Sequence, residues 1–315
     1  GTLNFNGGLT ASAPSQIYLA GTIAAGGAGV ISLAGASSGI SVTSTSTLGG
    51  TSTGAITLGD ISLADGVTLG IGTGIANAID LASISGTAAG TSSHLTINTL
   101  GTVNVSGTIG TDIGALTITQ SGGTTFASSV TTTSVVLTDT SDARTISFDA
   151  PLTTGTLTTA GQPYNLALNG VSGSVTNAVS FLNTGALTIG SSGGAQTYIA
   201  GLTAAAPSAT TLNGTISTSS SLSFKNVTLA SSTILTSTGS GGISFSSTID
   251  GGHDLTINTS GATTIGGAVG GSTPLASLTT NSGGSLAINT TSIKTTGAQS
   301  YGEAATLGAN VSLDT

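Results

Sequence analysis

Apolar and small polar residues alternate over short stretches along the whole chain. Typical segments have an apolar residue at each end and Ser, Thr or Asn between, as at 95–97, 103–105, 116–118, 187–189 and 255–257. A period of two over three to five residues predicts short strands with one buried face. Gly, Asn, Asp or Ser clusters follow these segments and supply turns. No segment shows the i, i+3, i+4, i+7 spacing of a helix, and Ser, Thr and Gly disfavour helix, so we expect almost none.

The alternating segments recur at a nearly constant interval. Five apolar residues of the C-terminal third follow one another at this interval: Leu222, Ile243, Ile265, Leu286 and Leu307. The same interval separates Leu95, Leu116 and Leu137, and it separates Leu166 from Leu187. A period of about 20 to 50 residues indicates stacked copies of one small unit. We therefore expect the five C-terminal residues to point inward and to form one column.

Two or three short strands with turns in every repeat match one coil of a parallel β-helix. The sequence predicts an all-β fold: a single, continuous, right-handed parallel β-helix (β-solenoid) over residues 1–315, with coils of about 21 residues. Neighbouring coils would pair about 4.8 Å apart, and about 15 of them would form. The main alternative is an array of β-sandwiches, but a sandwich domain of about 100 residues is much longer than this repeat.

The composition agrees with a solenoid whose surface carries hydroxyls and amides. Charged residues make up 4% of the 315 positions, against about 25% in an ordinary soluble domain. Regularly spaced Leu, Ile and Val argue against disorder, which is the alternative for a chain with 50 glycines. The net charge of −8 and only three Lys or Arg residues argue against nucleic acid and anionic membranes as partners. No apolar run approaches the length that would span a membrane.

Few residues could support catalysis or bind a metal. The chain has no Cys and two His, so neither a thiolate site, a zinc site nor a Ser/His/Asp triad is expected. Charges of both signs gather only at Asp139, Asp142 and Arg144, with Asp149 nearby. We expect a solvated turn with a local ion pair there. A Ca²⁺ site and the active site of a polysaccharide-acting enzyme are the alternatives.

The segment 250–254 (Asp-Gly-Gly-His-Asp) is the other candidate for chemistry. It has a faint similarity to the Gly-His-Gly element of pectin hydrolases. The paired aspartates and the cationic motif that accompany that element are missing from this sequence. We therefore expect a polar turn, and we expect no catalytic residue, cofactor or metal ion in the protein.

Aromatic residues recur in two contexts. Four of the six Phe residues follow an apolar residue and a Ser or Asn, namely Phe5, Phe148, Phe224 and Phe245. All four Tyr residues stand two positions after a Gln, in the pairs Gln16/Tyr18, Gln162/Tyr164, Gln196/Tyr198 and Gln299/Tyr301. We expect these tyrosines to fill a wide corner of the coil while Gln satisfies a turn. The alternative is that their rings stack on sugars.

The repeats resemble the passenger regions of large bacterial surface exoproteins. The most similar stretch runs from 295 to 301 (Thr-Thr-Gly-Ala-Gln-Ser-Tyr) and continues through 307–313. Such proteins are the filamentous-haemagglutinin-like and autotransporter-type adhesins. The resemblance extends over essentially the whole chain, and its motifs have low specificity. It implies a right-handed β-helix, secretion across the outer membrane, and a role in adhesion, biofilm or surface filaments. Residues 1–315 themselves match neither the N-terminal secretion domain nor the C-terminal membrane barrel of these families, so the resemblance leaves the export route open.

The two ends of the sequence suggest how copies could associate. Neither end offers a helix or charged coil as a cap, and strand-like segments stand at both, 3–5 and 311–314. An uncapped strand edge is a template for further pairing. We expect end-to-end stacking of copies through Leu3, Phe5, Val311 and Leu313; the alternative is that more coils continue in a longer chain.

From these features we expect a non-catalytic structural or adhesive protein outside a bacterial cell, in a surface or matrix filament. It would form homo-oligomers, and surface glycans or other cells are its expected targets. A polysaccharide-acting lyase or hydrolase and a carbohydrate-binding adhesin are the alternatives.

Overall fold

The computed structural model confirms an all-β fold of parallel strands, arranged in about 14 solenoid turns about 22 residues apart. It describes residues 1–87 and 90–315, but not the side chain of Asp142. Within these residues the only helix is a short 3-10 turn, η1 (Ser141–Ala143). None of the described segments is a helix long and apolar enough to cross a membrane. The chain divides into two compact units, unit 1 (Gly1–Tyr164) and unit 2 (Asn165–Thr315).

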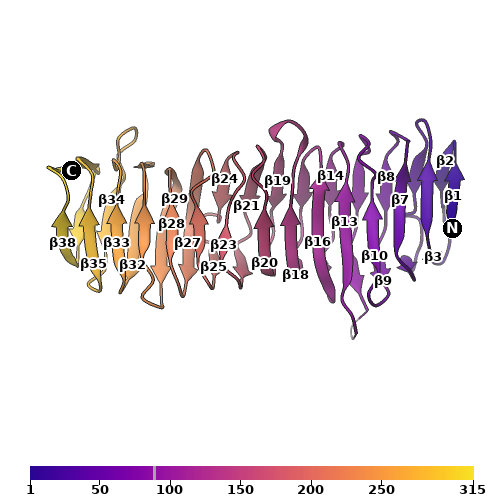
Figure 1. Ribbon diagram of the computed structural model, residues 1–315, viewed down its shortest axis with the longest axis horizontal. Coiled ribbons are helices and arrows are strands. Elements are labelled where there is room, and N and C mark those ends of the chain that lie inside the picture. Colours follow the sequence, from indigo (N-terminus) through magenta and orange to yellow (C-terminus); the bar gives the residue numbers. More distant parts are fainter. Residues whose placement is uncertain (88–89) are drawn as a thin grey trace. The chain divides into compact units, whose positions relative to one another are not determined.

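In unit 1 each coil adds strands to three parallel faces, which we name after their first strands (Figure 1). The β1 face contains β1 (Thr2–Phe5), β4 (Thr22–Ala25), β7 (Ser46–Gly50), β10 (Thr68–Ile71), β13 (Ser93–Asn98) and β16 (Ile113–Gln120). The β2 face contains β2 (Gly8–Thr10), β5 (Val30–Ser32), β8 (Ile56–Leu58), β11 (Ile79–Leu81), β14 (Val103–Val105), β17 (Thr124–Phe126) and β19 (Thr145–Phe148). The β3 face contains β3 (Ile17–Leu19), β6 (Ile40–Val42), β9 (Ile61–Leu63), β12 (Ile84–Gly86) and β15 (Ile109–Gly110). Two longer strands continue both the β3 and the β1 faces: β18 (Val130–Leu137) and β20 (Leu152–Thr159).

Unit 2 is also built from three parallel faces. The β21 face contains β21 (Asn165–Leu168), β24 (Leu187–Ile189) and β31 (Ile249–Asp250), followed by β36 (Ser292–Lys294) and β39 (Ser312–Asp314). The β22 face contains β22 (Ser172–Val175), β25 (Ala195–Tyr198), β32 (Asp254–Thr259), β34 (Ser277–Thr280) and β37 (Gln299–Tyr301). The long strands β27 (Thr210–Thr218) and β29 (Val227–Ser237) belong to both of these faces. The β23 face contains β23 (Val179–Ser180), β26 (Leu202–Ala204), β28 (Leu222–Phe224), β30 (Ile243–Phe245), β33 (Ala262–Ile265), β35 (Ser285–Ile288) and β38 (Ala304–Leu307).

Columns of inward apolar side chains form the core. On the β3 face of unit 1 the strand register stacks one buried column, Ile40, Ile61, Ile84, Ile109 and Val130. Burying each such side chain contributes about 1.5–3 kcal/mol, and β-branched residues suit a pleated surface. Phenylalanines stack in the same way, with ring centroids 4.6 Å apart for Phe126 and Phe148 and 5.7 Å for Phe224 and Phe245. The alternation in the sequence therefore marks the inward face of each short strand.

The predicted single column in the C-terminal third is wrong, because its members belong to two columns. Ile243 pairs with Thr263, and Ile265 instead pairs with Phe245. The two observed columns are Leu222–Ile243–Thr263–Leu286–Ala305 and Phe224–Phe245–Ile265–Ile288–Leu307. Four of the five predicted residues are buried, but Leu307 is 58% exposed on β38. A fixed interval fails because successive coils have different lengths, and a shift of two residues keeps a side chain inward while moving it to the next column.

Buried hydroxyl groups form hydrogen bonds between several turns and the preceding coil. The Thr99 hydroxyl lies 2.8 Å from the carbonyl oxygen of Ile75 and 2.6 Å from that of Asn77, and it accepts the backbone N–H of Gly101 at 3.0 Å. In unit 2, Thr259 donates to Gly241 O and accepts the N–H of Gly261. Ile75 O also accepts the backbone N–H groups of Asn77 and Leu100, so the Thr99 hydroxyl matters most for Asn77 O and for the N–H of Gly101.

Candidate functional site

The outward positions of the short strands form rows of hydroxyls along each unit. On the β3 face of unit 1 the strand register aligns Tyr18, Ser41, Ser62 and Ser85, followed by Gly110. We call Ser41, Ser62 and Ser85 the serine row. Successive members lie about 4.8 Å apart, because each belongs to the next paired strand. The row therefore presents one hydroxyl, able to donate and accept hydrogen bonds, at every coil.

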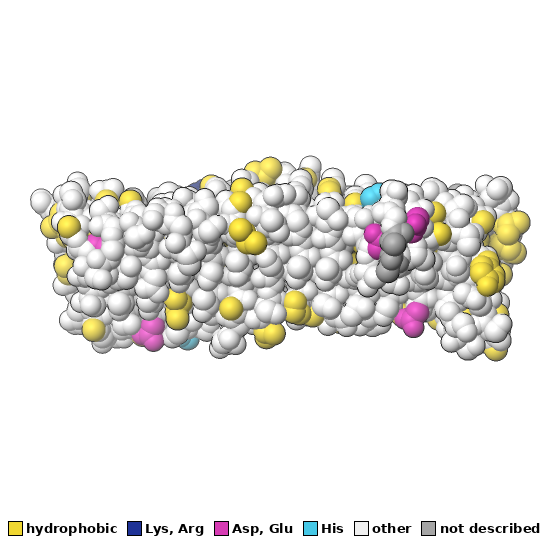
Figure 2. Space-filling model, turned by 90° about the horizontal axis from the view of Figure 1, so that it is seen from below, with side chains coloured by type: hydrophobic (Ala, Val, Ile, Leu, Met, Phe, Trp, Pro, Cys, Tyr) yellow, Lys and Arg dark blue, Asp and Glu magenta, His cyan; other side chains and the backbone are white. Residues whose placement is uncertain are grey.

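A longer row runs along the β23 face of unit 2. Its members in register are Ser180, Thr203, Ser223, Ser244, Thr264, Ala287 and Thr306. Only Ala287 interrupts the hydroxyls. On the face of the molecule shown in Figure 2, charged side chains are sparse and apolar side chains lie in small groups. These rows were missed in the sequence because their intervals vary with coil length.

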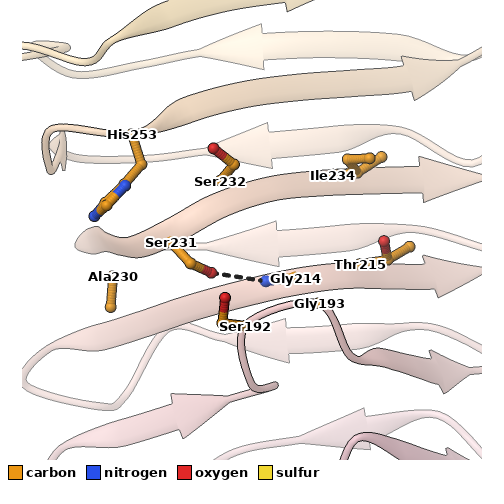
Figure 3. Close-up of a pocket in the computed structure, with 9 residues that line it drawn as sticks. All are labelled: Ser192, Gly193, Gly214, Thr215, Ala230, Ser231, Ser232, Ile234 and His253. Carbon is orange, nitrogen blue, oxygen red and sulfur yellow. Dashed lines mark hydrogen bonds between the residues drawn. The ribbon is translucent and has the colours of Figure 1, made fainter.

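Unit 2 also carries an open groove of about 560 Å³, lined by residues of β27 and β29, of the turn between β24 and β25, and of the turn before β32 (Figure 3). The groove follows from a register shift between β27 and β29, where Asn213 alone faces residues 230–232 of β29. These three residues bulge and form one wall. The lining residues drawn in Figure 3 are Ser192, Gly193, Gly214, Thr215, Ala230, Ser231, Ser232, Ile234 and His253.

Hydrogen bonds organise this groove without forming a catalytic group. Ser231 accepts the backbone N–H of Gly214 at 3.2 Å, as Figure 3 shows. Asp254 lies next to the groove and accepts hydrogen bonds from the hydroxyls of Ser277 (2.6 Å) and Ser232 (3.1 Å). These bonds, that from Ser277 most strongly, hold the pKa of the Asp254 carboxyl below its usual value. The imidazole of His253 extends away from Ser232 (Figure 3), so no nucleophile–base pair forms at this position.

The groove can accommodate a small polar molecule. Its lining includes the hydroxyls of Ser192, Thr215 and Ser232, and the side chain of Ile234 is 40% exposed. Hydroxyls beside the apolar side chains of Ala230 and Ile234 suit a neutral polyhydroxylated ligand better than an anion, because none of the nine lining residues is Lys or Arg.

The predicted charged cluster lies around η1 in unit 1. Asp139 accepts the N–H of Thr140 at 2.8 Å, and the hydroxyl of Thr140 donates to the carbonyl oxygen of Arg144 at 3.2 Å. Ser147 donates to the Asp149 carboxylate two residues away. The side chain of Asp142 lies outside the described part of the structure. Asp139 and Asp149 thus both hydrogen-bond within their own local segments.

The segment 250–254 spans a turn between β31 and β32. Asp250 accepts the N–H groups of Ser272 (2.7 Å) and Thr273 (3.1 Å), which belong to the following coil. The two aspartates of this segment therefore join neighbouring coils: Asp250 through backbone N–H groups and Asp254 through serine hydroxyls. Among the residues that the structure describes, no group of three or more Asp, Glu and His side chains could hold a metal ion.

The residues predicted to mediate end-to-end contact lie in different units. In unit 1, Leu3 is 60% exposed on β1 and Phe5 is half-buried. In unit 2, Leu313 is 48% exposed on β39, and Val311 precedes that strand and is half-buried. Each of these pairs contributes apolar surface that a further coil could cover.

The Gln-x-Tyr pairs differ in orientation, which the sequence did not reveal. In Gln196/Tyr198 both side chains point inward, and the phenol donates to Gln196 Oε1 at 3.0 Å. Tyr301 donates to Gln299 Oε1 at 2.9 Å, whereas the buried Tyr164 donates to Leu137 O at 3.1 Å. Burial raises the pKa of the Tyr164 and Tyr301 phenols to about 12. The expectation of a packing role is met by Tyr164 and Tyr198, but Tyr18 faces outward.

Comparisons with protein-family models, curated proteins and solved structures found no match.

Proposed function

We propose that the chain is a non-catalytic structural or adhesive β-solenoid of a bacterial surface or matrix filament, working outside the cell. The observation that supports this most is the hydroxyl row of the β23 face, where six of seven successive strands present Ser or Thr outward in register. Repeating, weakly charged hydrogen-bonding surfaces suit extended contact with another polymer or another copy. The resemblance to the filamentous-haemagglutinin-like and autotransporter-type passengers belongs to this proposal.

We further propose that copies associate end to end. Support comes from the exposed apolar side chains of Leu3 on β1 and Leu313 on β39. Stacking another coil on such a strand satisfies its backbone groups and covers Leu3, Phe5, Val311 and Leu313. A head-to-tail contact that repeats without closing produces an open filament.

Electron microscopy of the purified chain tests this assembly. The expected result is threads whose axial repeat matches one chain, growing with protein concentration. A Leu3→Asp/Leu313→Asp double variant should remain monomeric, because stacking would bury unpaired carboxylates. Particles that stay monomeric at high concentration in the unmodified protein would contradict end-to-end association.

A carbohydrate-binding adhesin is the second candidate, and the groove beside β27 and β29 favours it. A polysaccharide-acting enzyme would instead use Asp139, Asp142 and Arg144. Assays on uronic-acid polymers with the unmodified chain and with Asp142→Ala separate these possibilities. We expect no turnover; turnover that disappears in Asp142→Ala would establish the enzyme.

A further inference from the structure

Tyr18 occupies a position that the next three coils give to serine. The strands β3, β6, β9 and β12 read Ile-Tyr-Leu, Ile-Ser-Val, Ile-Ser-Leu and Ile-Ser-Gly, and the register places the middle residues side by side. The flanking residues of β6 and β9 are buried, so the middle residues face outward. An aromatic ring therefore stands at the head of the serine row.

The ring of Tyr18 contributes little to packing. Its side chain is 71% exposed, whereas Tyr164 and Tyr198 are fully buried. Its phenol donates to Gln16 Oε1 at 3.0 Å. Gln16 is also exposed, so this bond restrains the phenol without burying the ring. An oriented aromatic side chain offers a rigid apolar surface at low cost in conformational entropy.

The serine row supplies hydrogen-bonding groups beside this ring. Within the described residues, the hydroxyls of Ser41, Ser62 and Ser85 have no hydrogen-bond partner, so they can bond to a ligand. Their spacing of about 4.8 Å is close to the length that one hexose adds to an extended glycan chain. A hexose has one face of C–H groups, which packs on an aromatic ring, and a rim of hydroxyls, which bonds to serine.

The charge of this region selects a neutral ligand. Asp60 stands two residues before Ser62, is exposed, and accepts the N–H of Ser83 at 3.1 Å. The net charge of the whole chain is −8. Both would repel a polymer of uronic acids or sulfated sugars.

We propose that the β3 face binds an extended neutral polysaccharide, with one hexose stacked on Tyr18 and the following units bonded to the serine row. This inference rests on the adhesive role proposed above and names its ligand class. The groove of unit 2 is not required for it.

Co-sedimentation with microcrystalline cellulose and with chitin tests the proposal, with alginate gel as the anionic probe. Tyr18→Ser is the informative variant, because serine already occupies this position in three neighbouring coils and the fold should accept it. We expect the unmodified chain to bind at least one neutral polymer and not alginate. Tyr18→Ser should lower the affinity at least tenfold, Tyr18→Phe should retain most of it, and Lys225→Ala, the control in unit 2, should leave it unchanged.

A rescue variant tests the row as a whole. Tyr18→Ser/Ser62→Tyr moves the ring two coils along the same row, and it should recover most of the lost binding. Any of four results would overturn the proposal. The unmodified chain could bind neither neutral polymer or prefer alginate, Tyr18→Ser could bind as well as the unmodified chain, or the rescue variant could fail to recover binding. Electron microscopy of the same samples distinguishes failure of this proposal from failure of end-to-end assembly. Glycan binding without threads contradicts only the assembly, and threads without glycan binding contradict only the glycan site.

Discussion

The same Gln-x-Tyr pair has opposite orientations in β3 of unit 1 and β25 of unit 2. In both places the phenol donates to the Gln side chain at 3.0 Å. In β25 the pair occupies the inward positions, and Gln196 Nε2 donates to the carbonyl oxygens of Leu168 (2.6 Å) and Gly170 (3.2 Å). In β3 the inward positions belong to Ile17 and Leu19, so Gln16 and Tyr18 lie on the surface.

Moving the Gln-x-Tyr pair by one position along a strand therefore moves both side chains from the core to the surface. Side chains alternate between the two faces of a strand, so parity decides the environment of every residue in it. Gln and Tyr meet where the chain is extended, because residues i and i+2 of a strand share a face. Which face they share depends on the neighbouring apolar residues. Tyr164 lies outside the strands and bonds to Leu137 O instead.

The largest difference between the two pairs should appear when the rings are removed. Tyr198→Ala deletes a fully buried ring that contacts Phe181 edge-on, with centroids 6.2 Å apart. Loss of a large buried aromatic side chain lowers the free energy of unfolding by about 3–5 kcal/mol. Tyr18→Ala should change it by less than about 0.5 kcal/mol. Denaturant melts measure both, and equal losses would mean that the parity assigned to β3 or β25 is wrong.

Removing the Gln side chains should give a smaller difference in the same direction. Gln196→Ala removes the hydrogen-bond partner of the Gly170 carbonyl and of the Tyr198 phenol, whereas the Leu168 carbonyl still accepts the N–H of Gly190 at 2.9 Å. Each unsatisfied buried group costs about 1–3 kcal/mol, less where water can enter. Gln16→Ala should be nearly neutral. Urea melts compare the two variants, provided that the free energy of unfolding falls with urea concentration at the same slope in both. An unchanged free energy of unfolding in Gln196→Ala would show that the buried bonds contribute nothing.

Much of this fold could be predicted from the sequence, because alternation and repeat length are local properties of the chain. The segments 95–97 and 116–118 pair as expected, as do Leu166 with Leu187 and Leu222 with Ile243. The fixed interval failed at Thr263, which pairs with Ile243 in the place expected for Ile265. The sequence pattern did not mark Thr263 as a core residue, because it is not apolar and its burial depends on the register with the neighbouring coil.

The candidate sites were less predictable, because they depend on which coils become neighbours. The Asp254 carboxylate bonds to serines 22 and 23 residues away in opposite directions along the chain. The groove of unit 2 arises from a bulge of three residues whose position no composition signal marks. The serine row was present in the sequence as Ile-x-apolar triplets, and it could have been found by aligning triplets and allowing their spacing to vary.

The turn hydroxyls should contribute less than the Gln196 network. Thr99→Val keeps the shape of the side chain but removes the hydroxyl that serves Ile75, Asn77 and Gly101. We expect a loss of about 1–2 kcal/mol. The outward Thr131→Val on β18 is the matched control and should cost less than about 0.5 kcal/mol. Thermal and denaturant melts report both, and a costly control with a neutral Thr99→Val would contradict the role of the turn hydroxyl.

The effect confined to the narrowest range of conditions is a loss of stability in alkali. Burial raises the pKa of the Tyr164 phenol to about 12 from its ordinary value of 10.0. Below about pH 10 the phenol is protonated in both states, so its contribution is fully present; between about pH 10 and 12 the unfolded chain loses the proton first, and stability falls. Tyr164→Phe should flatten this decline in melts recorded from pH 8 to 12. If stability falls with pH equally steeply in Tyr164→Phe and in the unmodified chain, burial does not raise the pKa of the Tyr164 phenol.

Single-cysteine labelling tests most directly whether strand parity decides which side chains are available on the surface. The chain contains no Cys, so each introduced thiol is the only one. Cysteines at Tyr18, Ser41 and Ser62 should react with a soluble thiol reagent at nearly the rate of an unfolded peptide. Cysteines at Leu19, Val42 and Leu63 should be protected at least a hundredfold and should react only under unfolding conditions. Equal rates at neighbouring positions, or faster labelling of the second set, would contradict the account.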